Sequence, residues 1–115
     1  TINYNVRIGN RTTIMDNTHI TGNTVIGSNV FMGMSVVTSN DRKIGSLSYG
    51  KHVVGPTIGD DSKIGSGANI MPGVKIGSGA VVLGGSLVKR DVPPGRMVSV
   101  FPASDIGESR LLKRF

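Results

Sequence analysis

Aliphatic residues recur every six positions along most of this chain. A period of six is a multiple of two, so each unit can turn the same side of a short strand inward. A helix turns about 100° per residue and cannot keep such a stripe on one face. The pattern therefore predicts β-strands and excludes helix for two blocks, 2–37 and 58–93. The first positions of the units are Ile2, Ile8, Ile14, Ile20, Ile26, Met32, Ile58, Ile64, Ile70, Ile76, Val82 and Val88.

Two further columns of the repeat have their own physical causes. The fourth position is Asn, Asp or Gly in ten of the twelve units, and the fifth is always small or β-branched. Asn and Gly tolerate a left-handed backbone, so the fourth position predicts regular corners. One unit cannot bury its own aliphatic side chain, and the units must stack into a solenoid with parallel strands.

Residues 38–57 interrupt the repeat. The units after the break are two positions out of phase with those before it. We therefore expect an inserted loop that leaves the solenoid, and long loops in compact folds are often functional.

The unit Ile-Gly-Xaa-Xaa-small-Xaa resembles the hexapeptide repeat of the left-handed β-helix acyltransferases. The resemblance implies an all-β fold, a left-handed parallel β-helix with three units per coil. The left hand rests on the resemblance alone, because the ordinary crossover rule favours the right hand. We expect a β-helix domain over 1–103 and a short C-terminal helix over 104–115. A chain that begins at Thr1 also fits a piece of a longer enzyme.

Composition narrows the possible chemistry of the 115 residues. The chain has no cysteine, which excludes disulfides, thiolate zinc sites and cysteine nucleophiles. Two histidines are too few for the three-His zinc site of β-helical carbonic anhydrases, so we expect no metal. No apolar run approaches the roughly 20 residues of a membrane span, and we expect a cytoplasmic protein. The net charge of +6 suits CoA or a nucleotide, and we expect no nucleic-acid partner.

The interrupted segment carries the candidate catalytic residues. Related sugar acetyltransferases often have a catalytic His here in a Thr-Xaa-His context, but this chain reads Thr38-Ser39-Asn40-Asp41. That sequence resembles the Thr-Asn-Asp of the branch that N-acetylates amino groups on nucleotide-linked sugars. A hydroxyl acceptor needs a general base, whereas an unprotonated amine needs only to be oriented. We therefore predict that Asn40 is catalytic by positioning and that Asp41 binds substrate.

Two alternatives for the acceptor side stay open. His52, also in the loop, could serve as the base for a hydroxyl acceptor. Asp16 occupies the place where related sugar acetyltransferases often carry an Asp that contacts the acceptor. His19 is interpreted as a corner or subunit-contact residue.

The stretch "VLGGSLVKRDVPPG" resembles the closing motif of the family. The resemblance places Gly84 and Ser66 against the pantetheine arm of CoA. It places Lys89 and Arg90 near the adenosine 3′-phosphate, where cations are the natural partners. Two prolines, Pro93-Pro94, cannot extend a strand ladder and are predicted to end the solenoid.

The sequence thus predicts a homotrimeric acetyltransferase with its site between subunits and acetyl-CoA as co-substrate. The favoured reaction is N-acetylation of a nucleotide-linked amino sugar for cell-surface polysaccharide such as lipopolysaccharide. One alternative is O-acetylation of a sugar hydroxyl with His52 as base. Another is a non-catalytic β-helical scaffold or binding module, which would need neither the loop nor the basic closing motif.

Overall fold

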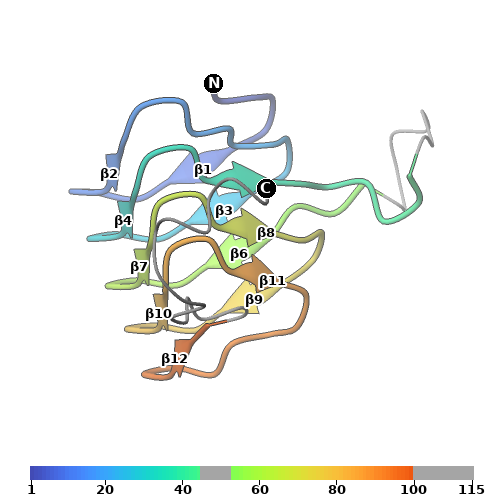
Figure 1. Ribbon diagram of the computed structural model, residues 1–115. Helices are drawn as coiled ribbons and strands as arrows, with labels where there is room; N and C mark the ends of the chain where they lie inside the picture. The colour runs from blue at the N-terminus through green and yellow to red at the C-terminus, as the bar shows by residue number, and fades with distance from the viewer. Residues whose placement is uncertain (45–52, 100–115) are drawn as a thin grey trace, which may run out of the picture.

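The computed structural model describes residues 1–44 and 53–99, which form a three-sided prism of stacked coils (Figure 1). Every described element is a two-residue strand, and three parallel sheets make the three sides. The strands are β1 (Arg7–Ile8), β2 (Thr13–Ile14), β3 (Val25–Ile26), β4 (Phe31–Met32), β5 (Val37–Thr38), β6 (Thr57–Ile58), β7 (Lys63–Ile64), β8 (Asn69–Ile70), β9 (Lys75–Ile76), β10 (Val81–Val82), β11 (Leu87–Val88) and β12 (Met97–Val98).

We call the sides of the prism the first, second and third face. The first face has the order β1-β3-β6-β9, the second β12-β10-β7-β4-β2 and the third β11-β8-β5. Successive coils pair 18 residues apart, as Arg7 does with Val25, which is three six-residue units. The predicted left-handed parallel β-helix is confirmed. The predicted C-terminal helix, 104–115, lies outside the described residues.

The inside of the prism is filled by the first and fifth positions of the repeat. From Ile20 onward the aliphatic first positions form a buried column along each face, with Ile20, Ile64 and Ile70 fully buried, whereas Ile2 and Ile8 in the first coil are exposed. Buried hydroxyls at the fifth position donate to backbone carbonyls, of their own turn or, for Thr18, of the next coil, so they carry no unpaired polar atom into the core. Ser62 Oγ donates to the Gly59 carbonyl at 2.6 Å, for example.

The corners adopt the left-handed backbone that the fourth position predicts. Eleven of the twelve fourth positions have positive φ, between 48° and 74°. Arg11 and Ser35 do so although their residue types do not favour it, because the corner geometry is set by the coil above and the coil below. The exception is Asp91, whose coil is built differently.

The loop is shorter than the sequence break. Val25 pairs with Thr57, a separation of 32 instead of 18, so 14 residues are extra. Thr38 is buried in β5, and the chain leaves the prism only after Ser39. It returns at Val54, whose N–H donates to the Asn40 carbonyl at 2.9 Å. The excursion therefore covers 40–53, and residues 45–52 of it lie outside the described part.

The expectation that Pro93-Pro94 end the solenoid is wrong. After the prolines, β12 pairs in parallel with β10. This coil is two residues short, since Ile76 pairs with Val92 only 16 residues later. At the shortened corner the Asp91 carboxylate accepts the Lys75 N–H at 2.9 Å. A side-chain oxygen thus takes the role that a backbone carbonyl has in the longer coils, and the prolines start another side of the prism.

The stacked column makes a direct stability prediction. Ile64→Ala should lower the free energy of unfolding by about 2–5 kcal/mol, because a fully buried side chain is removed from a column that cannot collapse locally. Its neighbour Lys63 is exposed in the same strand, and Lys63→Ala should change stability by less than about 0.5 kcal/mol. Urea unfolding of the two variants measures the difference. Equal losses would contradict the assignment of inward and outward positions.

Candidate functional site

The predicted site residues gather at two corners on opposite margins of the third face. We call the corner between the second and third faces the glycine corner; Ser66 and Gly84 share it in neighbouring coils, and Asp16 lies at the same corner two coils before Ser66. We call the corner between the third and first faces the loop corner, because residues 40–53 leave the prism there. Asn40, Asp41 and Arg90 belong to the loop corner. Lys89 follows β11 at the edge of the third face.

The glycine corner forms an exposed strip on which few side chains project from the backbone. Ser66 Oγ accepts the Met34 N–H at 3.2 Å, and the Ser66 carbonyl accepts the Gly85 N–H at 2.9 Å. A methyl group on Gly84 would stand 3.1 Å from the Ser66 carbonyl oxygen. Exposed Met34 and Leu83 border the strip. An extended, weakly polar chain can therefore lie along this corner against backbone.

The loop corner holds Asn40 in a fixed orientation. Its Nδ2 donates to the Gly22 carbonyl at 3.1 Å, and the side chain is half-buried. Gly22 is covered by the Tyr4 ring, which occupies the space that a side chain at position 22 would need. Asn23 Nδ2 donates to the Val53 carbonyl at 3.2 Å and ties the returning strand to the same corner. The Asn40 Oδ1 takes no hydrogen bond from the described residues and stays available as an acceptor.

The remaining candidates of the loop differ in what can be said of them. Asp41 is exposed and pairs in an antiparallel bridge with Val53 at the base of the loop. His52 lies outside the described residues, so its role as a base stays a prediction. His19 is half-buried on the third face in register with Val37, away from the loop corner.

A pocket of about 310 Å³ opens at the C-terminal end of the described prism. Lys89 and Arg90 are on its wall, and both side chains are exposed. The pocket borders the shortened turn, Lys89 to Asp91, in the last described coil. Its lining is Leu87, Val88, Lys89, Arg90, Asp91, Val92 and Val98.

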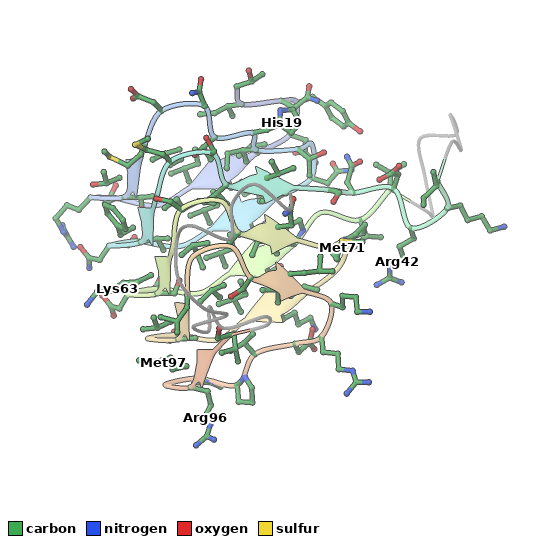
Figure 2. All side chains as sticks on the ribbon, viewed as in Figure 1. His19, Arg42, Lys63, Met71, Arg96 and Met97 are labelled. Carbon is green, nitrogen blue, oxygen red and sulfur yellow. The ribbon has the colours of Figure 1, made fainter. Side chains whose placement is uncertain are left out.

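Arg42 also belongs to the loop corner, although no pattern in the sequence indicates its position there. Its guanidinium lies directly against Gly73, in the space that a side chain at position 73 would take. Figure 2 shows Arg42 on the side of the prism from which the loop projects. Because the loop is outside the six-residue period, no column of the repeat could indicate this contact. Among residues 1–44 and 53–99, no three His, Asp or Glu side chains gather to hold a metal ion.

The repeat region matches the family described as Bacterial transferase hexapeptide (six repeats) over residues 5–40 and 55–90. The chain therefore belongs to this hexapeptide-repeat transferase family. A putative acetyltransferase of Bacillus subtilis, YvoF, is 35% identical over 78 residues, covering 67% of this chain and 43% of YvoF. The mitochondrial gamma carbonic anhydrase 2 of Arabidopsis thaliana is 33% identical over 111 residues, covering 86% of this chain and 34% of that protein.

Two solved structures are similar in fold. Soybean serine acetyltransferase complexed with serine has a TM-score of 0.69 and 35% identity, covering 86% of this chain and 39% of that one. A Vibrio cholerae hexapeptide-repeat acetyltransferase, VCA0836, complexed with acetyl coenzyme A has a TM-score of 0.70 and 30% identity, covering 89% of this chain and 59% of that one. The chain thus spans less than half of YvoF and of the soybean enzyme. In the part that the structure describes, no helix is long and apolar enough to cross a membrane.

The Asn40 contact can be tested without any substrate. Asn40→Asp puts a carboxylate oxygen opposite the Gly22 carbonyl and removes the donor, so stability should fall by about 1 kcal/mol or more. The loop should also become easier to cleave by protease, because its attachment at residue 40 is lost. Asn10→Asp is a suitable control, since Asn10 is an exposed corner residue whose described hydrogen bonds are made by its backbone only. Matching behaviour of the two variants would show that the Gly22 contact has no structural weight.

Proposed function

We propose that the protein transfers the acetyl group of acetyl-CoA to an amino group on a nucleotide-linked sugar. The observation that carries the proposal is Asn40, a neutral amide held at the base of the loop where a general base would otherwise stand. The family match and the acetyltransferases among its relatives support acetyl transfer. Such a product would serve cell-surface polysaccharide synthesis.

The glycine corner supports CoA binding along its strip. The pantetheine arm would lie against Ser66 and Gly84, where backbone is exposed and no side chain intervenes. Met34 and Leu83 would cover its apolar portions. Lys89 and Arg90 would meet phosphate through charge-assisted hydrogen bonds. The Vibrio cholerae neighbour, solved with acetyl coenzyme A, supports this choice of co-substrate.

Asn40 would act by orientation. Its Nδ2 is engaged by Gly22, so Oδ1 is the atom that can accept an N–H of the acceptor amine. The amine nitrogen then attacks the thioester carbonyl carbon, the C–S bond breaks, and CoA leaves as a thiolate that takes up the released proton. Most of the rate would come from holding the two reactants together. Asp16 and Asp41 are proposed contacts for the acceptor.

A homotrimer is proposed because one chain keeps the two halves of the site apart. Asn40 is at the loop corner and Gly84 at the glycine corner, with the third face between them. A closed threefold assembly would bring the loop corner of one subunit to the glycine corner of its neighbour. Each of three equivalent sites would then draw on two chains.

Mixing two impaired variants tests this shared site. Asn40→Ala and Gly84→Val chains, each at about a tenth of wild-type activity or less alone, should recover about a quarter of wild-type activity after mixing and reassembly in equal amounts, because a quarter of the sites then pair an intact residue 40 with an intact residue 84. No recovery, with mixed assemblies shown by mass spectrometry, would contradict a site formed between subunits.

A hydroxyl acceptor is the second candidate, and the similarity to soybean serine acetyltransferase favours it. Attack by a hydroxyl needs a base, and His52 is the residue available in the loop. A non-catalytic scaffold is the third candidate. It predicts that CoA does not raise the melting temperature, whereas a CoA enzyme should be stabilised by its ligand.

Release of free thiol from acetyl-CoA decides between the acceptors. With a panel of nucleotide-linked amino sugars, free amino sugars, sugar hydroxyl acceptors and serine, we expect release only with an amine. Asn40→Ala should lower kcat by about 10- to 100-fold, since an orienting contact is lost. His52→Ala should leave amine transfer unchanged. Release with serine or a hydroxyl sugar alone, abolished by His52→Ala, would overturn N-acetylation.

A further inference from the structure

We propose that Arg42 and Arg90 together form an anion site at the loop corner, which takes a phosphate group of a phosphorylated ligand. The inference rests on the proposed function, because the ligands considered are CoA and a nucleotide-linked acceptor. It adds a residue of the loop, Arg42, to the basic pair at the end of the repeat. It also makes the loop corner a binding site as well as the position of Asn40.

Both departures from the six-residue period fall at this one corner. The 14-residue excursion leaves between Ser39 and Val54, and the two-residue shortening lies between Val88 and Val92. The regular turn around Gly73 lies in the coil between them, one coil after the excursion and one coil before the shortened turn. Stacking needs neither departure, since the other two corners repeat without a change in length. Each departure supplies one arginine to the same edge of the prism.

The position of Arg42 is defined by its contact with Gly73. Gly73 has a φ of +70°, and its N–H donates to the Val54 carbonyl at 3.0 Å, which joins this turn to the returning strand of the loop. The guanidinium occupies the space beside Gly73 where a side chain would stand. Arg42 is nevertheless exposed, so its remaining donors face solvent at the corner.

Arg90 lies one coil below the same turn. Met71 donates its N–H to the Val88 carbonyl at 3.0 Å, and Lys75 donates to the Asp91 carboxylate at 2.9 Å. In the coil above, three residues, 72–74, connect Met71 to Lys75. In the coil of Arg90, this single residue takes their place. Neighbouring coils are about 4.8 Å apart, so two guanidinium groups on long side chains can reach one ligand group from both levels.

The charges around this edge favour an anion. Arg42, Arg90 and Lys89 are exposed there, and Lys75 is exposed on the adjoining first face. The acidic neighbours are Asp41 and Asp91, and the Asp91 carboxylate already accepts the Lys75 backbone N–H. Guanidinium groups bind phosphate oxygens through paired, charge-assisted hydrogen bonds. The chemistry that the corner recognises is a phosphate monoester or diphosphate.

Two sources can supply that phosphate: the 3′-phosphate of CoA and the diphosphate of a nucleotide-linked acceptor. Dissociation constants of wild type, Arg42→Gln and Arg90→Gln for CoA, dephospho-CoA and a nucleoside diphosphate distinguish them. We expect about a tenfold weakening in both variants for the ligand that uses the site. A weakening seen with CoA but not with dephospho-CoA identifies the 3′-phosphate. A weakening seen with the nucleoside diphosphate identifies the acceptor.

Arg96→Gln is the matched control. Arg96 is exposed on the far side of the prism from Arg42 (Figure 2), and its described hydrogen bonds are made by its backbone only. Its loss lowers the net charge by the same unit but should change each dissociation constant by less than about twofold. Arg42→Lys should recover part of the affinity, because it keeps the charge and loses the paired geometry. Melting temperatures of all variants should stay close to that of wild type.

The outcomes separate this site from the proposed reaction. If Arg42→Gln binds CoA and the nucleoside diphosphate as Arg96→Gln does, the anion site is wrong, even where wild type releases thiol with an amino sugar. If Arg42→Gln and Arg90→Gln both lose affinity while wild type acetylates no amine, the anion site stands and the proposed function fails.

Discussion

The fixed register between coils is the constraint on which the rest of the structure depends. Each strand has only two residues, so no strand is stable alone and every coil is held by hydrogen bonds to the coils above and below. The register can hold only if each side of the prism uses six residues and each corner turns in the same way. The left-handed backbone at the fourth position provides that turn. The buried aliphatic columns and the paired hydroxyls follow from it.

A scaffold of this kind offers little chemistry where it is regular. Its flat faces repeat every coil, and its buried inward side chains are aliphatic or hydrogen-bonded to the backbone. The features that could bind or orient a ligand occur where the repeat changes length or loses a side chain. In the described part of the chain these places are the excursion after Ser39, the shortened turn at Arg90 and the exposed backbone at Gly84. They lie at two corners, which is why a second copy of the chain is needed in the proposed site.

The sequence predicted the prism closely because one repeat specifies both its core and its turns. The period located the first positions, which are buried from Ile20 onward, and the residue types of the fourth position predicted the left-handed corners, eleven of which are seen. The hand of the helix came from the family resemblance. The prediction for Pro93-Pro94 failed, because a missing N–H matters only on the side that another coil must cover. The Asp91 carboxylate also accepts a backbone N–H that the shortened turn would otherwise leave unpaired. The contact between Arg42 and Gly73 could not be predicted, since it joins a loop outside the period to a turn some 30 residues later. The motif singled out Asn40 as a candidate, but the sequence did not indicate its hydrogen bond to Gly22.

The excursion from the third face leaves and re-enters the prism at the same corner without disturbing the coils on either side. The cost of closing a loop grows only slowly with its length, so the number of residues in it is nearly independent of the energetics of the stack. Loop and scaffold can therefore vary separately. A chain of this architecture can exchange its loop for one of different length and residue content while the buried columns stay unchanged, and new acceptor preferences can arise by such exchanges without a new fold.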